Sequence, residues 1–202
     1  MYYLETNSTV LKTNKVLAFF LIALFVGNGT LFAQNNDTST AVSWYSFEGA
    51  LMFNKERAEK GLPTKKIFID VYTDWCGWCK RMDATTFAHP VIVEKLNGEW
   101  IPVKFNAERK DTITINGQQF VYVNGNPNSS RGLHQLAHIL LNGQMSYPSY
   151  ALIDETGKPI QNIQGYQNAR QFEMLLDFFS SNIYKTTDWQ EFQKTYQGLV
   201  SE

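Results

Sequence analysis

Residues 66–80 read KIFIDVYTDWCGWCK, and this stretch decides the fold. It contains Cys76 and Cys79, the only two cysteines among 202 residues. A disulfide stabilises a fold more when it closes a longer loop, so a structural cross-link would rarely use both cysteines of a chain on so short a loop. Two thiols three positions apart can instead form a small disulfide and open it again. The pair therefore indicates redox chemistry.

The sequence around the cysteines predicts that they lie between the end of a strand and the start of a helix. Residues 66–73 form an apolar, β-branched run that is typical of a buried central strand. A helix is predicted over about residues 76–87, so Cys76 lies at its N-terminus, where free N–H groups and the helix dipole stabilise a thiolate. The two residues after the motif are both basic, Lys80 and Arg81. Cys76 is expected to be the attacking thiol, and Cys79, inside the first turn, the resolving thiol.

The N-terminal sequence has the features of an export signal. Two lysines precede an apolar run over residues 16–26. Eleven apolar residues fit the core of a signal peptide, and a bilayer-spanning helix needs about 20. Ala33 suits the position before a cleavage site, so we expect a signal peptide over residues 1–33. Because the apolar stretch runs on to Phe32, an uncleaved membrane anchor is the alternative.

The rest of the chain is expected to form a linker and one domain. Residues 34–42 are polar and predict a flexible linker that begins with Gln34 after cleavage. Residues 43–202 have the length of one ordinary domain with room for a core. The net charge is −1, with charges of both signs interspersed, so the composition indicates no nucleic-acid partner. We expect a periplasmic or secreted protein whose only relation to the membrane is the export signal.

The order of predicted elements indicates an α/β fold with a central mixed β-sheet flanked by helices. The expected helices cover residues 43–60, 76–87, 91–96, 131–141 and 169–181, and a last one starts at Thr187. The expected strands cover residues 66–73, 100–106, 149–153 and 158–164. An insertion over about residues 109–132 should contain a β-hairpin, because Ile113-Thr114-Ile115 and Phe120-Val121-Tyr122 flank Asn116-Gly117. Both turn residues tolerate positive φ.

Several residues outside the motif resemble the thioredoxin superfamily. Asp70 stands six residues before the first cysteine, where this family keeps a buried carboxylate, and Lys104 in the next strand matches a family lysine near it. Tyr147-Pro148, just before a strand, looks like the cis-proline segment of the family, and residues 154–158 look like the hairpin turn that follows. A cysteine pair of this spacing near strands and helices is itself a thioredoxin-like signal.

The wider pattern is similar to the thioredoxin-like domain of periplasmic thiol-reducing electron-transfer proteins and their small secreted relatives. The residues that carry this pattern are Asp74, Trp75, Cys76, Cys79, Lys80, Met82, Phe87, Pro90, Val91 and Ile92. The resemblance covers about residues 43–181 and implies a thioredoxin-like fold. The insertion over about residues 109–132, with its expected β-hairpin, is a departure, because minimal thioredoxins lack it. The resemblance also implies a protein thiol–disulfide oxidoreductase that needs no cofactor, because the thiols themselves carry the electrons.

The resemblance gives expected roles to residues of the site. The redox disulfide would join Cys76 and Cys79, and a buried Asp70 with a raised pKa would accept the proton of Cys79. For Asp70, a solvated carboxylate or a salt bridge with Lys104 is the simpler alternative. A cis Pro148 would receive a substrate strand. The expected substrate-binding residues are Trp75, Trp78, Tyr147 and Pro148.

The expected partners are proteins with disulfides or thiols, and an upstream thiol that donates or accepts electrons. Trp78 replaces the proline that is common between thioredoxin cysteines, so the direction of electron flow stays open. One alternative is a thioredoxin-fold binding or chaperone-like module with little turnover.

A second alternative is a Cys₂His₂ zinc site that combines the cysteines with His134 and His138. Its spacing is far from that of a zinc finger. We therefore expect no metal, and both histidines at the surface or at an interface.

Overall fold

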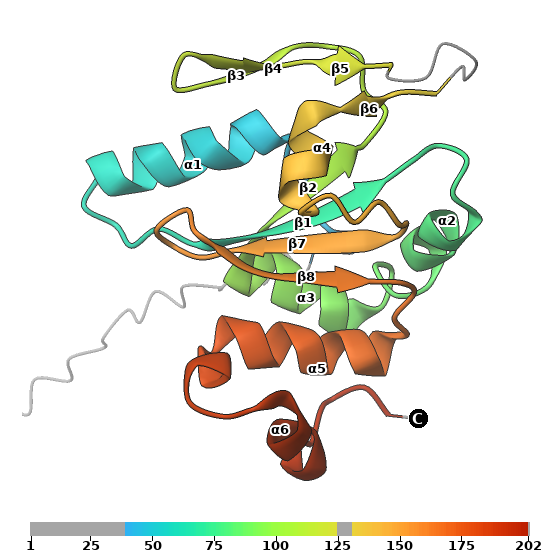
Figure 1. The fold of residues 1–202 in the computed structure, drawn as a ribbon. Helices are drawn as coiled ribbons and strands as arrows, with labels where there is room; N and C mark the ends of the chain where they lie inside the picture. The colour runs from blue at the N-terminus through green and yellow to red at the C-terminus, as the bar shows by residue number, and fades with distance from the viewer. Residues whose placement is uncertain (1–38, 125–130, 202) are drawn as a thin grey trace, which may run out of the picture. The chain divides into compact units, whose positions relative to one another are not determined.

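The computed structural model describes residues 39–124 and 131–201. Their centre is a four-stranded sheet with the order β2-β1-β7-β8 (Figure 1). The strands are β1 (Lys66–Tyr72), β2 (Trp100–Asn106), β7 (Ser149–Ile153) and β8 (Pro159–Gln164). β1 runs parallel to β2 and antiparallel to β7, and β8 runs antiparallel to β7. The predicted mixed sheet is confirmed, and each strand agrees with its predicted range to within one residue.

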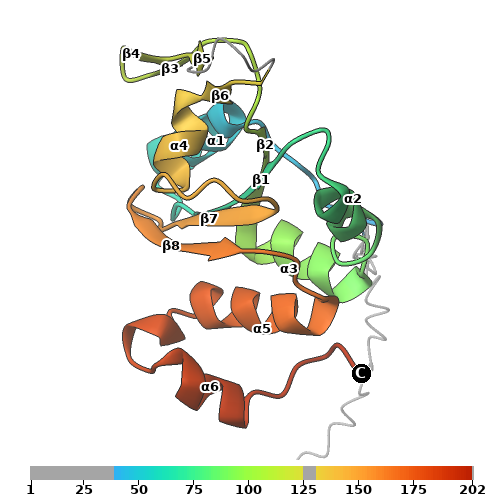
Figure 2. The same ribbon diagram turned by 45° about the vertical axis from the view of Figure 1, so that its right-hand side comes forward.

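Helices cover both faces of this sheet (Figure 2). The helices on one face are α1 (Phe47–Glu59) and α4 (Gln135–Leu140). Those on the other face are α3 (Pro90–Glu99) and α5 (Ala169–Ser180). α2 (Gly77–Ala84) follows β1 at one end of the sheet, whereas η1 (Ile183–Lys185) and α6 (Trp189–Thr195) pack outside α5. This is the expected thioredoxin-like arrangement.

β1 is buried on both faces, as its nearly unbroken apolar sequence predicts. Ile67, Ile69 and Val71 contribute to the core beneath α1 and α4, while Phe68 contributes to the core beneath α3 and α5. Side chains alternate along a strand, so Asp70 shares the face of Phe68. The carboxylate of Asp70 therefore lies in an otherwise apolar core.

The inserted hairpin is confirmed with its turn and first strand, whereas its second strand begins directly after the turn and two residues earlier than predicted. β3 (Ile113–Ile115) pairs antiparallel with β4 (Gln118–Phe120) across Asn116 and Gly117. These two residues have φ angles of 50° and 83°, as a two-residue hairpin turn with both central residues at positive φ requires. A second small pair follows, β5 (Tyr122–Val123) with β6 (Leu133–His134).

The predicted helix over residues 131–141 is wrong at its start. β6 occupies its first part, and α4 begins only at Gln135, with His134 as its N-cap. The Nδ1 atom of His134 accepts a hydrogen bond from the backbone N–H of Leu136. This side chain is fully buried, so its predicted surface position is also wrong, whereas His138 is exposed as predicted. A histidine that caps a helix from the end of a strand cannot also lie on the outer face of that helix.

The N-terminal helix begins later than residue 43. Ser46 is the N-cap of α1, and Tyr45 forms a short parallel bridge to Val103 at the outer edge of β2. Just before it, Asn97 of α3 accepts a hydrogen bond from the backbone of Ser43 and donates one to the carbonyl of residue 41. Residues 1–38, and with them the predicted signal peptide, lie outside the described residues.

The C-terminal segment is anchored to α5 by one buried carboxylate. Glu173 is fully buried and accepts hydrogen bonds from the backbone N–H groups of Leu199 and Val200, at 2.8 and 2.9 Å. α6, whose N-cap is Asp188, covers the outer side of α5 through aromatic contacts with Phe178. In the described part of the chain, no helix is long and apolar enough to span a bilayer.

Candidate functional site

The two cysteines form a disulfide at the N-terminus of α2, the helix that follows β1. Cys76 is the N-cap of α2, and its Sγ atom accepts a hydrogen bond from the backbone N–H of Cys79 at 3.0 Å. Their exposed fractions are 5% and 3%. The N-cap position predicted for Cys76 is confirmed. In the reduced protein the same N–H group and the helix dipole would stabilise a thiolate on Cys76.

Asp70 lies buried in β1, with an exposed fraction of 1%. Its Oδ2 atom accepts a hydrogen bond from Nζ of Lys104 at 2.6 Å, and its Oδ1 atom has no hydrogen-bond partner among the described residues. Burial raises the pKa of Asp70 to about 6, although the charge of Lys104 acts in the opposite direction. A carboxyl group with such a pKa can exchange a proton near neutral pH.

Lys104 connects Asp70 to the surface. It stands opposite Asp70 in the register of β1 and β2, and its Nζ atom also forms a salt bridge with Asp83 of α2. The side chain of Asp83 is 47% exposed. Burial opposes the charge of Lys104, yet its two carboxylate partners raise its pKa overall. A chain of charges therefore leads from the buried Asp70 to solvent.

Aromatic rings hold this lysine in place. The Nζ atom lies 4.9 to 5.2 Å from the centroids of the rings of Trp44, Tyr72 and Phe87. Such contacts stabilise a cation that has lost part of its hydration. The rings thus help Lys104 to remain charged beside Asp70.

Trp75 and Trp78 flank the disulfide and are about half exposed, at 49% and 54%. The ring of Trp75 meets that of Tyr147 edge-on, with 5.9 Å between centroids. Trp78 packs on Tyr166, with 5.3 Å between centroids. The Tyr147-Pro148 peptide bond is cis, as the resemblance implied. The exposed rings of Trp75 and Trp78 thus form an apolar surface beside the cysteines.

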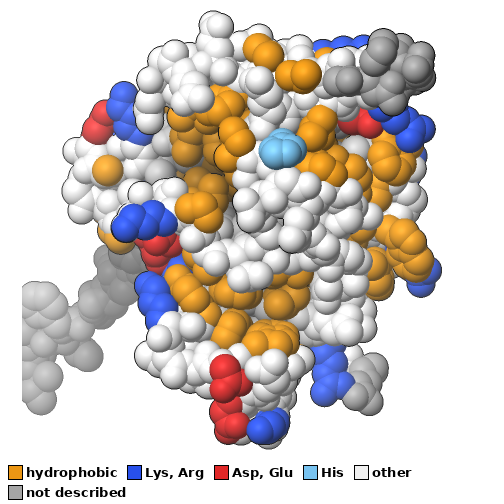
Figure 3. Space-filling view, in the orientation of Figure 1, with side chains coloured by type: hydrophobic (Ala, Val, Ile, Leu, Met, Phe, Trp, Pro, Cys, Tyr) orange, Lys and Arg blue, Asp and Glu red, His pale blue; other side chains and the backbone are white. Residues whose placement is uncertain are grey.

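Charged residues position the two tryptophans. The indole N–H of Trp75 donates a hydrogen bond to Glu108 at 2.9 Å, and Arg131, from the insertion, lies over the Trp75 ring at 4.6 Å. Arg81 lies over both Trp78 and its neighbouring tyrosine ring. Figure 3 shows charges of both signs spread over the face drawn, with apolar side chains at the edge where α2 lies. The surface therefore combines aromatic rings with charged side chains that contact them.

Sequence reasoning missed Asp83, Glu108, Arg131 and Tyr166 at this site. A helical signal existed for Asp83, since it follows Cys79 by four residues and so shares a helix face with it. No local signal marks Glu108 or Tyr166, because the fold alone brings them to the tryptophans.

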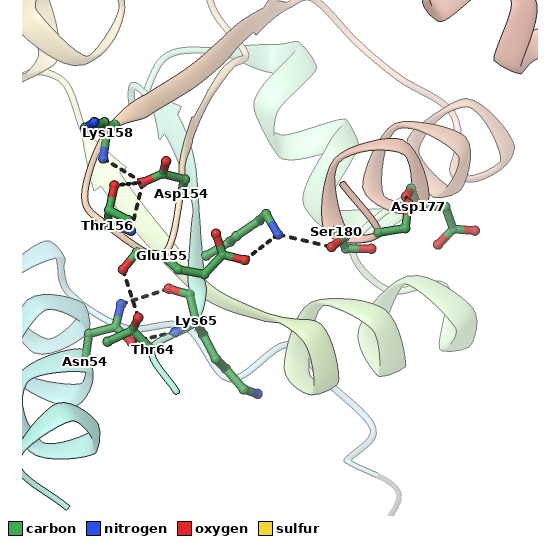
Figure 4. A network of polar contacts seen from close by, with 11 residues as sticks. Asn54, Thr64, Lys65, Asp154, Glu155, Thr156, Lys158, Asp177 and Ser180 are labelled. Atoms are coloured by element: carbon green, nitrogen blue, oxygen red, sulfur yellow. Dashed lines mark hydrogen bonds and ion pairs between the residues drawn. The ribbon is translucent and has the colours of Figure 1, made fainter. Parts of the chain in front are cut away.

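A cavity of about 620 Å³ lies at the opposite end of β1 from the disulfide. Its lining includes Lys66, whose Nζ atom donates to Glu155 at 2.6 Å and to the carbonyl of Ser180 at 3.1 Å. Figure 4 shows this network, in which Thr64 donates to the carbonyl of Glu155. None of the residues that line the cavity belongs to α2. The network ties the β7–β8 turn to the end of α5, and we assign it no part in the thiol chemistry.

The Cys₂His₂ alternative does not fit this geometry. The two sulfur atoms are bonded to each other. The Nε2 atom of His134 is hydrogen-bonded to the carbonyl of Asp111, and its Nδ1 atom accepts from a backbone N–H. Within residues 39–124 and 131–201, no group of three or more His, Cys, Asp or Glu side chains could hold a metal ion. The fold does not bring the four residues of this alternative together.

The mixed sheet with helices on both faces, and a cysteine pair at the start of the helix after β1, define a thioredoxin-like protein. A family model described as a thioredoxin-like domain matches residues 53–180. The chain therefore belongs to the thioredoxin-like domain family, and the predicted superfamily is confirmed.

Several solved structures are similar in fold. DsbH oxidoreductase is 15% identical, with 68% of this chain and 83% of that chain covered and a TM-score of 0.45. The oxidised C-terminal domain of DsbD from Neisseria meningitidis is 20% identical, with coverage of 69% and 99% and a TM-score of 0.42. A putative disulphide-isomerase from Bacteroides thetaiotaomicron is 20% identical, with coverage of 73% and 98% and a TM-score of 0.45. No curated protein sequence matches the chain.

Proposed function

We propose that this protein is an exported thiol–disulfide oxidoreductase that acts on protein disulfides. The observation that carries the proposal is the closed disulfide of Cys76 and Cys79 at the N-terminus of α2, with a buried carboxylate of raised pKa in the adjoining strand. A purely structural disulfide would require neither a position at the N-terminus of a helix nor a buried carboxylate of raised pKa beside it.

The proposed reaction begins with the reduced protein. The thiolate of Cys76 attacks one sulfur of a substrate disulfide, and the second substrate sulfur leaves as a thiolate, so a mixed disulfide remains. The thiol of Cys79 then loses its proton to Asp70 and attacks the sulfur of Cys76. The bond between the sulfur of Cys76 and the substrate sulfur breaks, and the substrate is released with both of its sulfurs reduced. The protein then holds the disulfide of the present structure. An upstream thiol would reduce it again.

The aromatic surface is the proposed contact with the substrate. Trp75 and Trp78 expose apolar rings beside the cysteines, and Tyr147 contacts the first of them. Pro148 immediately precedes β7, so we assign it the reception of an extended substrate segment. Aromatic rings supply large contact areas at low cost in side-chain entropy, which suits transient binding of different protein chains.

The reduction of insulin by dithiothreitol tests the activity. We expect the protein at micromolar concentration to shorten the onset of insulin precipitation several-fold, because its dithiol relays electrons faster than the small thiol reacts alone. An onset equal to that without protein would contradict the oxidoreductase and favour the binding module. The reduction potential of the Cys76–Cys79 pair would then establish the direction of electron flow.

Export is tested by the N-terminus of the protein in its own cell. We expect the mature chain to begin at Gln34 and to be recovered from the periplasmic or secreted fraction, because residues 16–26 have the length of a signal-peptide core. N-terminal sequencing of the recovered protein measures this. A chain that retains residues 16–32 in the membrane fraction would show an anchor instead.

A further inference from the structure

Tyr150 is a fully buried tyrosine whose hydroxyl group has no hydrogen-bond partner among the described residues. The large majority of buried side-chain polar atoms have such a partner, and an unpaired one calls for an explanation. Phenylalanine would fill the same space among apolar neighbours without burying an oxygen atom. The hydroxyl group is therefore a feature for which packing gives no reason.

The register of the sheet brings Tyr150 beside Asp70. The two residues stand directly opposite each other in the antiparallel pair of β1 and β7. Side chains in such positions point to the same face, with Cβ atoms about 4.5–5.5 Å apart. The Oδ2 atom of Asp70 is held by Lys104, and the Oδ1 atom, like the hydroxyl of Tyr150, has no partner in the described part of the chain. Two buried unpaired oxygen atoms thus share one face of the sheet.

The rings around Tyr150 hold it in this position. Its ring lies 5.5 Å from that of Phe68, 5.5 Å from that of Phe172 and 6.3 Å from that of Phe87, between centroids. Burial, and after it the charge of Asp70, raise the pKa of Tyr150. The phenol group therefore remains protonated at neutral pH and can act as a donor.

We propose that Tyr150 is a positioning residue for proton transfer, whose hydroxyl group donates a hydrogen bond to one water molecule that in turn donates to Oδ1 of Asp70. This inference deepens the proposed function and rests on it for the role of Asp70. In the resolving step, the thiol proton of Cys79 passes to Oδ1, and the sulfur of Cys79 bonds to that of Cys76. The bond from Cys76 to the substrate breaks, and the substrate sulfur leaves with the electron pair. Tyr150 keeps its own proton throughout.

The other charged and titratable groups near Asp70 and Tyr150 come from β2, α2, β1 and the segment after β8. Lys104 of β2 lowers the pKa of Asp70, and Asp83 of α2 raises it. Tyr72 lies on β1 itself, and its own pKa is raised first by burial and in part by Asp70. Tyr166, after β8, lies near Tyr150. A hydrogen bond to the ionised carboxylate would act in the same direction as Lys104. Its loss should therefore raise the pKa of Asp70 further.

The variant Tyr150→Phe tests this directly. We expect the titration midpoint of the Asp70 carboxyl carbon, followed by ¹³C NMR in the oxidised protein, to rise by about one pH unit. The matched control is Tyr184→Phe, which removes a hydroxyl group from a tyrosine that packs on Phe178 and Phe179; it should leave the midpoint unchanged. This readout involves no thiol reaction, so it does not depend on the proposed function. An unchanged midpoint in Tyr150→Phe would overturn the inference.

A second measurement needs no variant. In the unmodified protein, the ¹³Cζ signal of Tyr150 should follow the titration of Asp70, and a signal that ignores it would contradict the hydrogen bond. In exchange assays, Tyr150→Phe should resolve mixed disulfides up to about tenfold more slowly below the midpoint, with no further effect in an Asp70→Asn background. A shifted midpoint in a protein without exchange activity would retain the hydrogen bond and refute the oxidoreductase.

Discussion

Replacement of Cys76 by serine is expected to abolish disulfide exchange, with a loss of at least about 10³-fold in the rate of insulin reduction. Cys76 is the N-cap of α2, and its sulfur accepts a hydrogen bond from the backbone N–H of Cys79. This position stabilises the attacking thiolate, which the variant lacks. A serine hydroxyl keeps the cap but is not a nucleophile toward disulfides at neutral pH. The rate with dithiothreitol as the electron donor measures the loss, and circular dichroism checks that the fold is intact.

The matched variant is Cys79→Ser, which retains the attacking thiol. It should still attack substrates but accumulate mixed disulfides, because nothing remains to resolve them. Non-reducing electrophoresis of extracts from cells that express this variant would show the trapped species, and Cys76→Ser should trap none. The assignment of roles is wrong if alkylation of the reduced protein at neutral pH proceeds faster on Cys79 than on Cys76.

The CxxC helix start and the central strands could be predicted because their signals are local. Residues 66–72 form an apolar run of strand length, and the cysteine pair follows it at once. The same holds for the hairpin at Asn116-Gly117, whose turn depends on two adjacent residues. Each of these elements is specified by residues within a few positions of one another.

The parts that escaped prediction depend on distant segments. His134 looked like a surface residue of a helix, because nothing in its neighbourhood showed that a short strand would bury it first. Arg131 reaches Trp75 only because the insertion folds back toward the site. From the sequence alone, a salt bridge of Asp70 to Lys104 is an alternative to a functional carboxylate, yet the structure contains the salt bridge together with a raised pKa of Asp70. The two interpretations are therefore compatible.

Asp70→Asn is expected to slow the resolution of mixed disulfides by about 10²-fold, because the proposed proton acceptor of Cys79 is removed. The same variant should be more stable near neutral pH. The pKa of Asp70 rises from 3.8 to about 6 on folding, chiefly through burial. An acid whose pKa is higher in the folded state makes the fold less stable once it ionises, so the gain from asparagine should be absent below pH 4 and grow between pH 4 and pH 6.

Above pH 6 this gain should level off at about 1–3 kcal/mol, since one pKa unit corresponds to about 1.4 kcal/mol. The loss of one of the two carboxylate partners of Lys104 offsets part of the gain. Denaturant titrations of both proteins from pH 3 to pH 8 measure it, and stopped-flow exchange measures the resolving step.

Asp83→Asn is the control, because it removes the exposed partner of Lys104 and leaves Asp70 in place. It should change stability by less than about 1 kcal/mol. If Asp70→Asn instead loses stability while resolution proceeds at the original rate, Asp70 is a structural partner of Lys104 and takes no part in the proton transfer.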